Sequence, residues 1–348
     1  MLVEEIRAEH GLDHYFASAP KPNDPSGQGV PLHHLRWLFR ATPLRWLHGW
    51  RSFLAADLFD RAVAPRLTAS RIFVGFAGSA RHSFRRVRQL GFQQLVLESP
   101  TSHVGHVQRQ HRLAAEAYPI EESWLNPALV RKTLGEYAEA DVIRVTSDYA
   151  LRSFLDAGVP SHKVQRWMLS SAPRFAPPPY GRHNRGFHVV YVGRLQVTKG
   201  VPVLLEAFTR LSDANAALTL VGGFATSAME RYTQRMVATD RRIRISPGDP
   251  LPHLHRADVL VHPSFEDGLG LAPLEALATG VPVIVTADTG MKELISEGQN
   301  GFIVPTGDVG ALLDGLQRMR ARPLKGTFDP LSQQTSARLG APAGRWAR

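Results

Sequence analysis

The sequence predicts an α/β protein built on parallel, doubly wound sheets. Three observations indicate this class. Short apolar strands alternate with helical stretches after residue 187, glycines stand where strands turn into helices, and a chain of 348 residues is too long for one ordinary core. Alternation of this kind gives right-handed crossover units in a parallel sheet, and the length favours two domains.

In the second half of the chain, strand-like and helix-like hydrophobic patterns alternate more clearly than in the first half. Its predicted strands are His188–Val192, Leu218–Val221, Ile243–Ile245, Val259–Val261, Val281–Thr286 and Phe302–Val304. Its predicted helices are Val201–Leu211, Ala228–Ala238, Leu271–Ala278 and Val309–Met319. In such a sheet, ligands bind beyond the carboxyl ends of the strands.

The first half predicts a second, smaller α/β domain. Its predicted strands are Ile72–Phe76, Gln94–Leu97 and Val142–Thr146, and its predicted helices are Ser83–Leu90 and Pro127–Ala140. The sequence APPPYGRHNRG, at 176–186, is the best candidate for a linker. We therefore expect an N-terminal domain at 1–175, a C-terminal domain at 187–321, and an atypical tail at 322–348, for which disorder is one expectation.

Composition excludes several classes of protein. The hydrophobic content of 43% and the charged content of 21% are those of a globular protein. No apolar run approaches the length of a membrane span and no signal peptide opens the chain, so we expect a cytoplasmic protein. The absence of cysteine excludes disulfides, thiol nucleophiles and thiolate metal ligands.

A formal charge of +10 is compatible with nucleic acid, an anionic membrane or phosphorylated substrates as partners. Arginines cluster near residues 81–88, 182–194 and 241–244 without interleaved aromatic repeats, and no nucleic-acid-binding motif accompanies them, which disfavours nucleic acid. Arginine far outnumbers lysine throughout, as a compositional bias of the source genome alone would produce.

Residues 31–63 predict amphipathic helix that is rich in tryptophan and arginine. Such a segment suits an anionic membrane surface, but it equally suits a helix packed on its own domain. Because Pro43 and Gly49 interrupt the helix, packing is favoured, and peripheral contact with the inner membrane surface stays the alternative. The residues concerned are Trp37, Trp46 and Trp50 among Arg36, Arg40, Arg45 and Arg51.

The stretch from His262 to Gly290 is the most informative segment of the chain. A strand runs into a glycine loop and then into the helix from Leu271, so free N–H groups at the helix start suit a phosphate. Glu275 lies in the first turns of this helix, where a carboxylate can accept two hydrogen bonds from a sugar diol. The alternative is a solvated turn whose acids support the helix dipole. The other candidates are Glu266 and Asp267 on the loop and Gly268, Leu269 and Gly270 at the turn.

A second motif, VVYVGRLQVTKGVPVLLEAF, covers residues 189–208. A strand runs into Gly193, and Arg194 and Lys199 then lie on the loop before the next helix. Two cations beside a strand end can clamp a diphosphate. Taken alone, the two residues are better interpreted as exposed loop charges.

Together the two motifs resemble the family 4 glycosyltransferases, which are retaining enzymes with the GT-B fold of two facing Rossmann-like domains. The resemblance rests on VGRL-x3-KG, LLEAF, VGG, HPS-x2-DG-x-GL-x3-E, GVPVI and NGF-x-VP, in that order within residues 187–320. Residues 136–164 resemble the segment before the interdomain crossing. Residues 95–110 resemble the loop that presents a histidine to the donor sugar, with His103 as the match and His106 as the fallback.

The resemblance implies a UDP-, GDP- or ADP-sugar donor bound to the C-terminal domain. Arg194 and Lys199 would neutralise its diphosphate, Glu275 would hold the ribose, and His103 would contact the sugar. Asp267 occupies the first acidic place of the family's E-x7-E pattern, where a glutamate is expected, and Glu266 lies one residue too early. No Asp-x-Asp motif occurs, so neither a metal ion nor another cofactor is expected.

The implied activity is transfer of a sugar to a glycan or lipid-linked acceptor in the synthesis of cell-surface polysaccharide or lipopolysaccharide. Two alternatives stay open. One is a catalytically inactive or truncated homologue that acts as a binding subunit, because the chain opens without the family's first strand and glycine-rich loop and ends without its long last helix. The other is a charge-driven binder of membranes or nucleic acid. The resemblance also implies that the backbone near Ser246–Asp249 contacts the base of the donor nucleotide.

Overall fold

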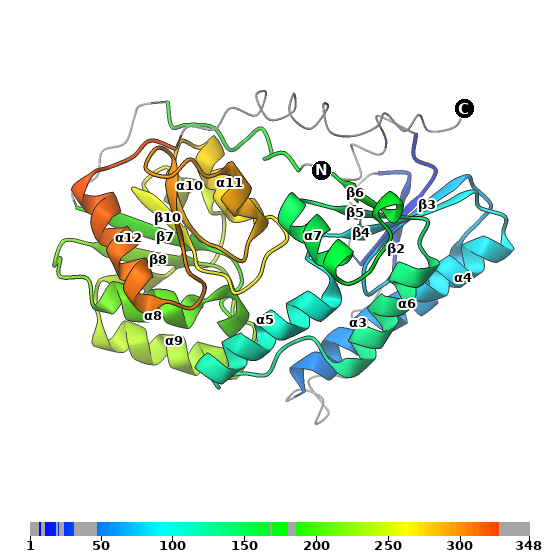
Figure 1. The fold of residues 1–348 in the computed structure, drawn as a ribbon, viewed down its shortest axis with the longest axis horizontal. Helices are drawn as coiled ribbons and strands as arrows, with labels where there is room; N and C mark the ends of the chain where they lie inside the picture. Colours follow the sequence, from blue (N-terminus) through cyan, green and yellow to red (C-terminus); the bar gives the residue numbers. More distant parts are fainter. Residues whose placement is uncertain are drawn as a thin grey trace.

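The computed structural model describes residues 7, 11–18, 20, 24–30, 47–167, 169–179 and 186–326. Within them the chain forms two parallel β-sheets, each flanked by helices, that lie beside one another (Figure 1). No helix in these ranges is long and apolar enough to cross a membrane.

The N-terminal sheet has the strand order β3-β4-β5-β6, and every pairing is parallel. Its strands are β3 (Ile72–Phe76), β4 (Gln94–Ser99), β5 (Val142–Val145) and β6 (Val164–Arg166). Its helices are α3 (His48–Val63), α4 (Arg81–Gln89), α6 (Pro127–Glu139) and α7 (Asp148–Asp156), with the short 3-10 helices η2 (Ala64–Arg66) and η3 (Ser161–Lys163). The strands β1 (Tyr15–Ala17) and β2 (Gly27–Gly29) form a separate parallel pair.

The C-terminal sheet has the strand order β12-β11-β10-β7-β8-β9, also fully parallel. The strand order reverses between β7 and β10, and this is where doubly wound sheets bind ligands. Its strands are β7 (His188–Val192), β8 (Ala217–Val221), β9 (Ile243–Ile245), β10 (Val259–His262), β11 (Val283–Thr286) and β12 (Gly301–Val304). Its helices are α8 (Val201–Thr209), α9 (Ser227–Thr239), α10 (Leu251–Leu254), α11 (Leu271–Ala278) and α12 (Val309–Ala321), with η4 (Val197–Lys199) and η5 (Gly290–Leu294).

Helix α5 (Val104–Ala117) links the two domains (Figure 1). Val104 and Val107, at its start, belong to the N-terminal core, whereas Ala114 and the following Tyr118 pack in the C-terminal core. The stretch 95–110, which resembles the segment that presents a histidine, consists of β4, a short loop at residues 100–103 and the first half of α5. Since α5 divides its apolar side chains between two cores, it lacks the single apolar stripe that would reveal a helix.

The strands and helices predicted for both halves are present, with bounds that shift by up to two residues. Two elements without a prediction, α7 and β6, lie in residues 148–166. The expectations for residues 180–185 of the linker, for residues 327–348 of the tail and for most of the opening residues lie outside the described residues.

Helix α3 packs on its own domain, but not through the aromatic side chains that the sequence suggested. Its buried residues include Asp57, Asp60 and Val63, whereas the side chain of Trp50 is 47% exposed. Trp37 and Trp46 lie outside the described residues.

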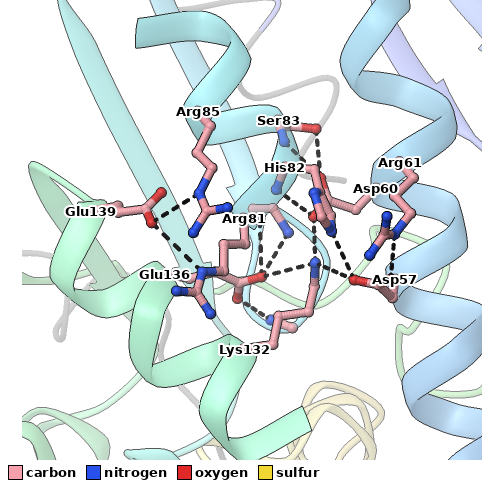
Figure 2. Close-up of polar contacts among 12 residues, drawn as sticks. Asp57, Asp60, Arg61, Arg81, His82, Ser83, Arg85, Lys132, Glu136 and Glu139 are labelled. Carbon is pink, nitrogen blue, oxygen red and sulfur yellow. Dashed lines mark hydrogen bonds and ion pairs between the residues drawn. The ribbon is translucent and has the colours of Figure 1, made fainter. Parts of the chain in front are cut away.

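A buried ionic network joins α3, α4 and α6 (Figure 2). The Lys132 ammonium lies 2.5 Å from an Asp60 oxygen and 3.2 Å from an Asp57 oxygen, and its side chain is only 4% exposed. The Asp60 carboxylate also accepts hydrogen bonds from the backbone N–H groups of His82 and Ser83 at the start of α4. Glu136 accepts three more N–H bonds from the turn before α4, and burial raises its pKa to about 7. One cation thus holds the carboxylates that fix the position of α4.

We predict that Lys132→Met destabilises the protein by about 3–5 kcal/mol, because it leaves buried carboxylates without their cation. Urea unfolding followed by circular dichroism measures the change. Arg131→Met is the matched control, because Arg131 is the neighbouring residue on α6 and is exposed, so it should change stability by less than about 0.5 kcal/mol. Equal midpoints for the two variants would show that the network adds no net stability.

Candidate donor-binding site

The two sequence motifs meet where the strand order reverses. The Lys199 ammonium, at the end of η4, lies 2.7 Å from Asp267 Oδ2 and 3.4 Å from the carbonyl oxygen of Glu266, both in the loop after β10. His262 Nε2 lies 3.1 Å from the same Asp267 oxygen. Gly200 (φ 68°) permits this packing, because a Cβ there would lie 1.8 Å from the Pro263 carbonyl oxygen. The loops after β7 and β10 therefore form one structural unit.

The charges of this unit are fixed by their mutual contacts. Burial acts to raise the pKa of Asp267, but Lys199 and His262 outweigh it and hold this pKa well below its usual range. For Lys199, burial acts to lower the pKa, and Asp267 and Glu266 raise it above its usual value. Both partners are therefore ionised at neutral pH, and Asp267 neutralises the cation that the sequence predicted for the donor phosphates.

Glu266 faces the N-terminal domain. Its side chain is buried, and its Oε1 accepts a hydrogen bond of 3.0 Å from the backbone N–H of Ser102. Burial first, and the neighbouring Asp267 charge second, raise the pKa of Glu266 to about 7. The two adjacent acids thus have different environments: Asp267 pairs with Lys199, and Glu266 joins the domains.

Helix α11 begins at the same place without a side-chain cap. Gly270 is its N-cap residue, and no side chain accepts the N–H groups of the first turn. Glu275 is half-buried on this helix, and burial raises its pKa while the nearby Arg174 acts to lower it. Arg174 also pairs with Asp249 at 3.1 Å, which places it beside the loop expected to contact the base. Arg174 was not predicted from the sequence, because it lies in residues 169–179, outside both motifs.

Arg194 has different neighbours from Lys199. It follows Gly193 at the end of β7, is exposed, and pairs with no carboxylate in the described ranges. It acts to lower the pKa of Glu121, which burial raises. The Glu121 carboxylate in turn accepts bonds from the Val197 N–H (2.7 Å) and from the Thr226 hydroxyl (2.6 Å). Arg194 therefore lies beside the segment that follows α5.

The two candidate histidines have different surroundings. His103 caps α5, since its Nδ1 accepts the Gly105 N–H at 3.2 Å, and its ring lies about 5 Å from those of Tyr137 and Phe154. His106 Nε2 lies 2.8 Å from the hydroxyl oxygen of Tyr149. Burial lowers the pKa of both histidines, but only His106 is also affected by groups of the C-terminal domain, Asp288 and Lys292.

Further contacts fix the approach of the two domains. Glu293 of the C-terminal domain accepts the N–H groups of Asp148 and Tyr149 at the start of α7. The Ser147 hydroxyl donates to the carbonyl oxygen of Gly268 at 2.5 Å. A Cβ at Gly268 would lie 2.1 Å from the Pro100 carbonyl oxygen. None of these contacts was predicted from the sequence, because each of them joins residues more than a hundred positions apart.

No group of three or more histidine, aspartate or glutamate side chains is placed to hold a metal ion in the parts of the chain that the structure describes. The expectation that the site uses no metal or other cofactor stays a prediction.

We predict that Glu266→Gln changes how stability depends on pH. A raised pKa means that the folded state binds the proton more tightly than the unfolded chain, so this stabilisation is complete below about pH 4.5 and is lost as the pH rises through about 7. Glutamine keeps the Oε1 acceptor and carries no charge. The variant should match the wild type near pH 5 and melt at a higher temperature near pH 8, as measured by differential scanning fluorimetry. Parallel pH profiles would contradict the assignment.

We predict that Gly268→Ala separates the domains, because its Cβ has no room against Pro100. Overpacking of this kind costs about 1–3 kcal/mol. Small-angle scattering should show a larger radius of gyration, and the Ser102 amide should exchange its hydrogen faster. Gly223→Ala is the control, because nothing lies within 4 Å of a Cβ at Gly223. An unchanged scattering profile for Gly268→Ala would mean that the loop yields without moving the domains.

The sequence of this chain is similar to those of known glycosyltransferases. Residues 186–321 match the model of the family described as Glycosyl transferases group 1. The D-inositol 3-phosphate glycosyltransferase of Salinispora tropica is 33% identical over 150 residues, which cover 39% of this chain and 31% of that protein. A GDP-mannose-dependent alpha-(1-6)-phosphatidylinositol monomannoside mannosyltransferase of Mycolicibacterium smegmatis is 27% identical over 276 residues, which cover 72% of this chain and 69% of that protein. This chain thus spans about a third of the length of the first of these relatives.

Solved structures share the fold. Sucrose-phosphate synthase from Thermosynechococcus elongatus has a TM-score of 0.67 at 20% identity, over 88% of this chain and 79% of that one. Anabaena HepE in complex with UDP has a TM-score of 0.60 at 15% identity, over 81% of this chain and 82% of that one. Residues 186–321 thus match the group 1 glycosyltransferase family, and the two domains of the chain have the GT-B fold.

Proposed function

We propose that this protein transfers a sugar, with retention of configuration, from a nucleotide-sugar donor to a glycan or lipid-linked acceptor in the synthesis of a cell-surface polysaccharide or lipopolysaccharide. The observation that carries the proposal is the meeting of Lys199 with the uncapped start of α11 at the reversal of strand order. A cation and free N–H groups in one place suit a diphosphate. Among the similar proteins, HepE is described in complex with UDP, and the mycolicibacterial relative is described as GDP-mannose-dependent.

Lys199 is proposed to stabilise the leaving diphosphate. Because Asp267 already neutralises Lys199, the ammonium is held in place, and it would share its charge with the phosphate as negative charge develops there. The N–H groups of Gly268, Leu269, Gly270 and Leu271 would add hydrogen bonds at the helix start. Arg194 is the second cation of the proposal and would have to reach the diphosphate from its exposed position.

Glu275 is proposed to accept hydrogen bonds from the ribose of the donor. The nearby Arg174 acts to lower the pKa of Glu275 and so favours its ionised form, which is the better acceptor. The same Arg174 pairs with Asp249, so one arginine would connect the ribose site with the expected base site.

The N-terminal domain would present a histidine to the donor sugar. His106 is favoured over His103 for this role, because it lies within electrostatic range of Asp288 and Lys292, whereas the ring of His103 caps α5. In the proposed reaction the acceptor attacks from the side that the leaving group departs, and the phosphate takes the proton. No side-chain nucleophile is then needed.

A lipid-linked acceptor would place the protein at the cytoplasmic face of the membrane. Support for peripheral contact comes from α3, where Trp50 and Leu58 are exposed and Leu47, just before the helix, is exposed as well.

A catalytically inactive binding subunit is the second candidate. It is favoured by Asp267, whose short side chain is engaged by both Lys199 and His262 and so is less free to contact a sugar than a glutamate would be. Binding of a nucleotide sugar without turnover would support this candidate.

We predict that purified protein turns over at least one UDP-, GDP- or ADP-sugar in the presence of a lipid-linked acceptor. Lys199→Ala and Glu275→Gln should each lower kcat by about 10²–10³, the loss expected when one transition-state donor or one orienting group is removed. Release of the nucleoside diphosphate measures the rate.

Glu116→Gln is the matched control, because Glu116 is exposed and lies in neither motif. Its rate should equal that of the wild type. Saturable donor binding without turnover would leave the binding subunit, and no stabilisation by any nucleotide sugar in a thermal-shift panel would refute both candidates.

A further inference from the structure

The N-terminal domain has a surface cavity of about 420 Å³, open to solvent, between α3 and α4. In Figure 1 these helices lie on the side of the N-terminal domain away from α11, and none of the lining residues belongs to the loops after β7 and β10. The cavity is therefore separate from the candidate donor site. Its lining consists of Arg61, Ala64, His82, Arg85, Arg86 and Gln89.

The lining is strongly basic. Three guanidinium groups and one imidazole face a single cavity, and no lining residue is acidic. Arg61 pairs with Asp57 at 2.7 Å and Arg85 lies 3.6 Å from Glu139. Arg86 pairs with no carboxylate in the part of the chain that the structure describes. The cavity thus carries more positive charge than its neighbours neutralise.

One buried carboxylate, that of Asp57, contacts lining residues on both α3 and α4. Asp57 Oδ2 accepts from Arg61 Nε on α3, and Asp57 Oδ1 lies 3.0 Å from His82 Nε2 on α4 (Figure 2). Burial acts to raise the pKa of Asp57, but Arg61, Lys132 and His82 lower it to about 2, so this carboxylate is ionised at neutral pH. Arg61 and His82 are therefore positioned by the ionic network before any ligand arrives, and such preorganisation lowers the cost of binding.

We propose that this cavity binds a phosphate group. A dianion satisfies several guanidinium groups at once, and the planar N–H pairs of arginine match phosphate oxygens better than any other side chain. Asp57 is shared with Lys132, and Glu139 is shared with Arg81, so Arg61 and Arg85 are only partly neutralised. A single carboxylate carries only one charge and would leave part of the cluster unneutralised. The phosphate belongs either to a soluble phosphorylated molecule or to a phospholipid headgroup, since both present the same chemistry.

The test is a titration of the full-length chain with pyrophosphate, with hydrogen exchange as the local readout. Binding should protect residues 48–63 and 81–89, whereas binding in the donor site would protect residues 197–204 and 266–275 instead. Arg86→Gln should weaken the binding that protects α3 and α4 by about tenfold, as expected for one lost hydrogen bond between charged groups. Arg131→Gln removes the same charge from an exposed position in the same domain and should leave this binding unchanged.

Vesicles distinguish the two sources of phosphate. Sedimentation with phosphatidylglycerol vesicles that is weakened by Arg86→Gln and not by Arg131→Gln identifies a headgroup, and pyrophosphate binding without such sedimentation identifies a soluble ligand. The proposal is overturned if pyrophosphate gives no protection in residues 48–63 and 81–89, or if Arg86→Gln and Arg131→Gln weaken binding equally, which would show an unspecific effect of net charge.

Discussion

Carboxylates that accept backbone N–H groups of the opposite domain hold this molecule together. Glu266 accepts from Ser102, Glu293 accepts from the start of α7, and Glu121 accepts from Val197 at the start of η4. An unpaired buried N–H or carboxylate is costly, so each contact satisfies both partners only while the domains stay close. The candidate donor site lies among these contacts, and the geometry of its loops therefore depends on the domain arrangement as well as on the sheet beneath it.

Local patterns made the C-terminal domain predictable. The helix Leu271–Ala278 was predicted with the bounds that the structure has, because its apolar period and the glycines before it are adjacent in sequence. Helix α5 was missed because its side chains serve two cores. Arg174 and Glu293 were missed for a different reason. Their partners lie 75 or more positions away, so no local period or spacing marks them. The sequence thus revealed the residues that form a motif and missed those that position it.

The contacts of Asp267 and Glu266 could not be predicted from the spacing of the motif. Spacing placed Asp267 in the family's first acidic position, and its neighbour Glu266 one residue too early. The structure shows that both acids are engaged, since Asp267 pairs with Lys199 and Glu266 joins the domains. If Glu266 were ionised beside Asp267, two like charges would share a buried place, and this repulsion contributes to the raised pKa of Glu266. Below about pH 7 Glu266 is mostly protonated, so the pair then carries close to one negative charge, which is what Lys199 can neutralise.

The two proposed phosphate sites consequently differ in their electrostatics. In the donor site the ammonium of Lys199 is already paired, so attraction there rests largely on the N–H groups of α11, which are fixed dipoles of short range. In the cavity between α3 and α4, Arg86 is unpaired within the described residues and the lining has no acid. Interactions of net charges at an exposed surface are screened by salt, whereas short-range hydrogen bonds in a buried site are screened much less. Phosphate binding at the cavity should therefore fall steeply with ionic strength, while donor binding should fall only slightly, and the two sites can be separated by salt alone.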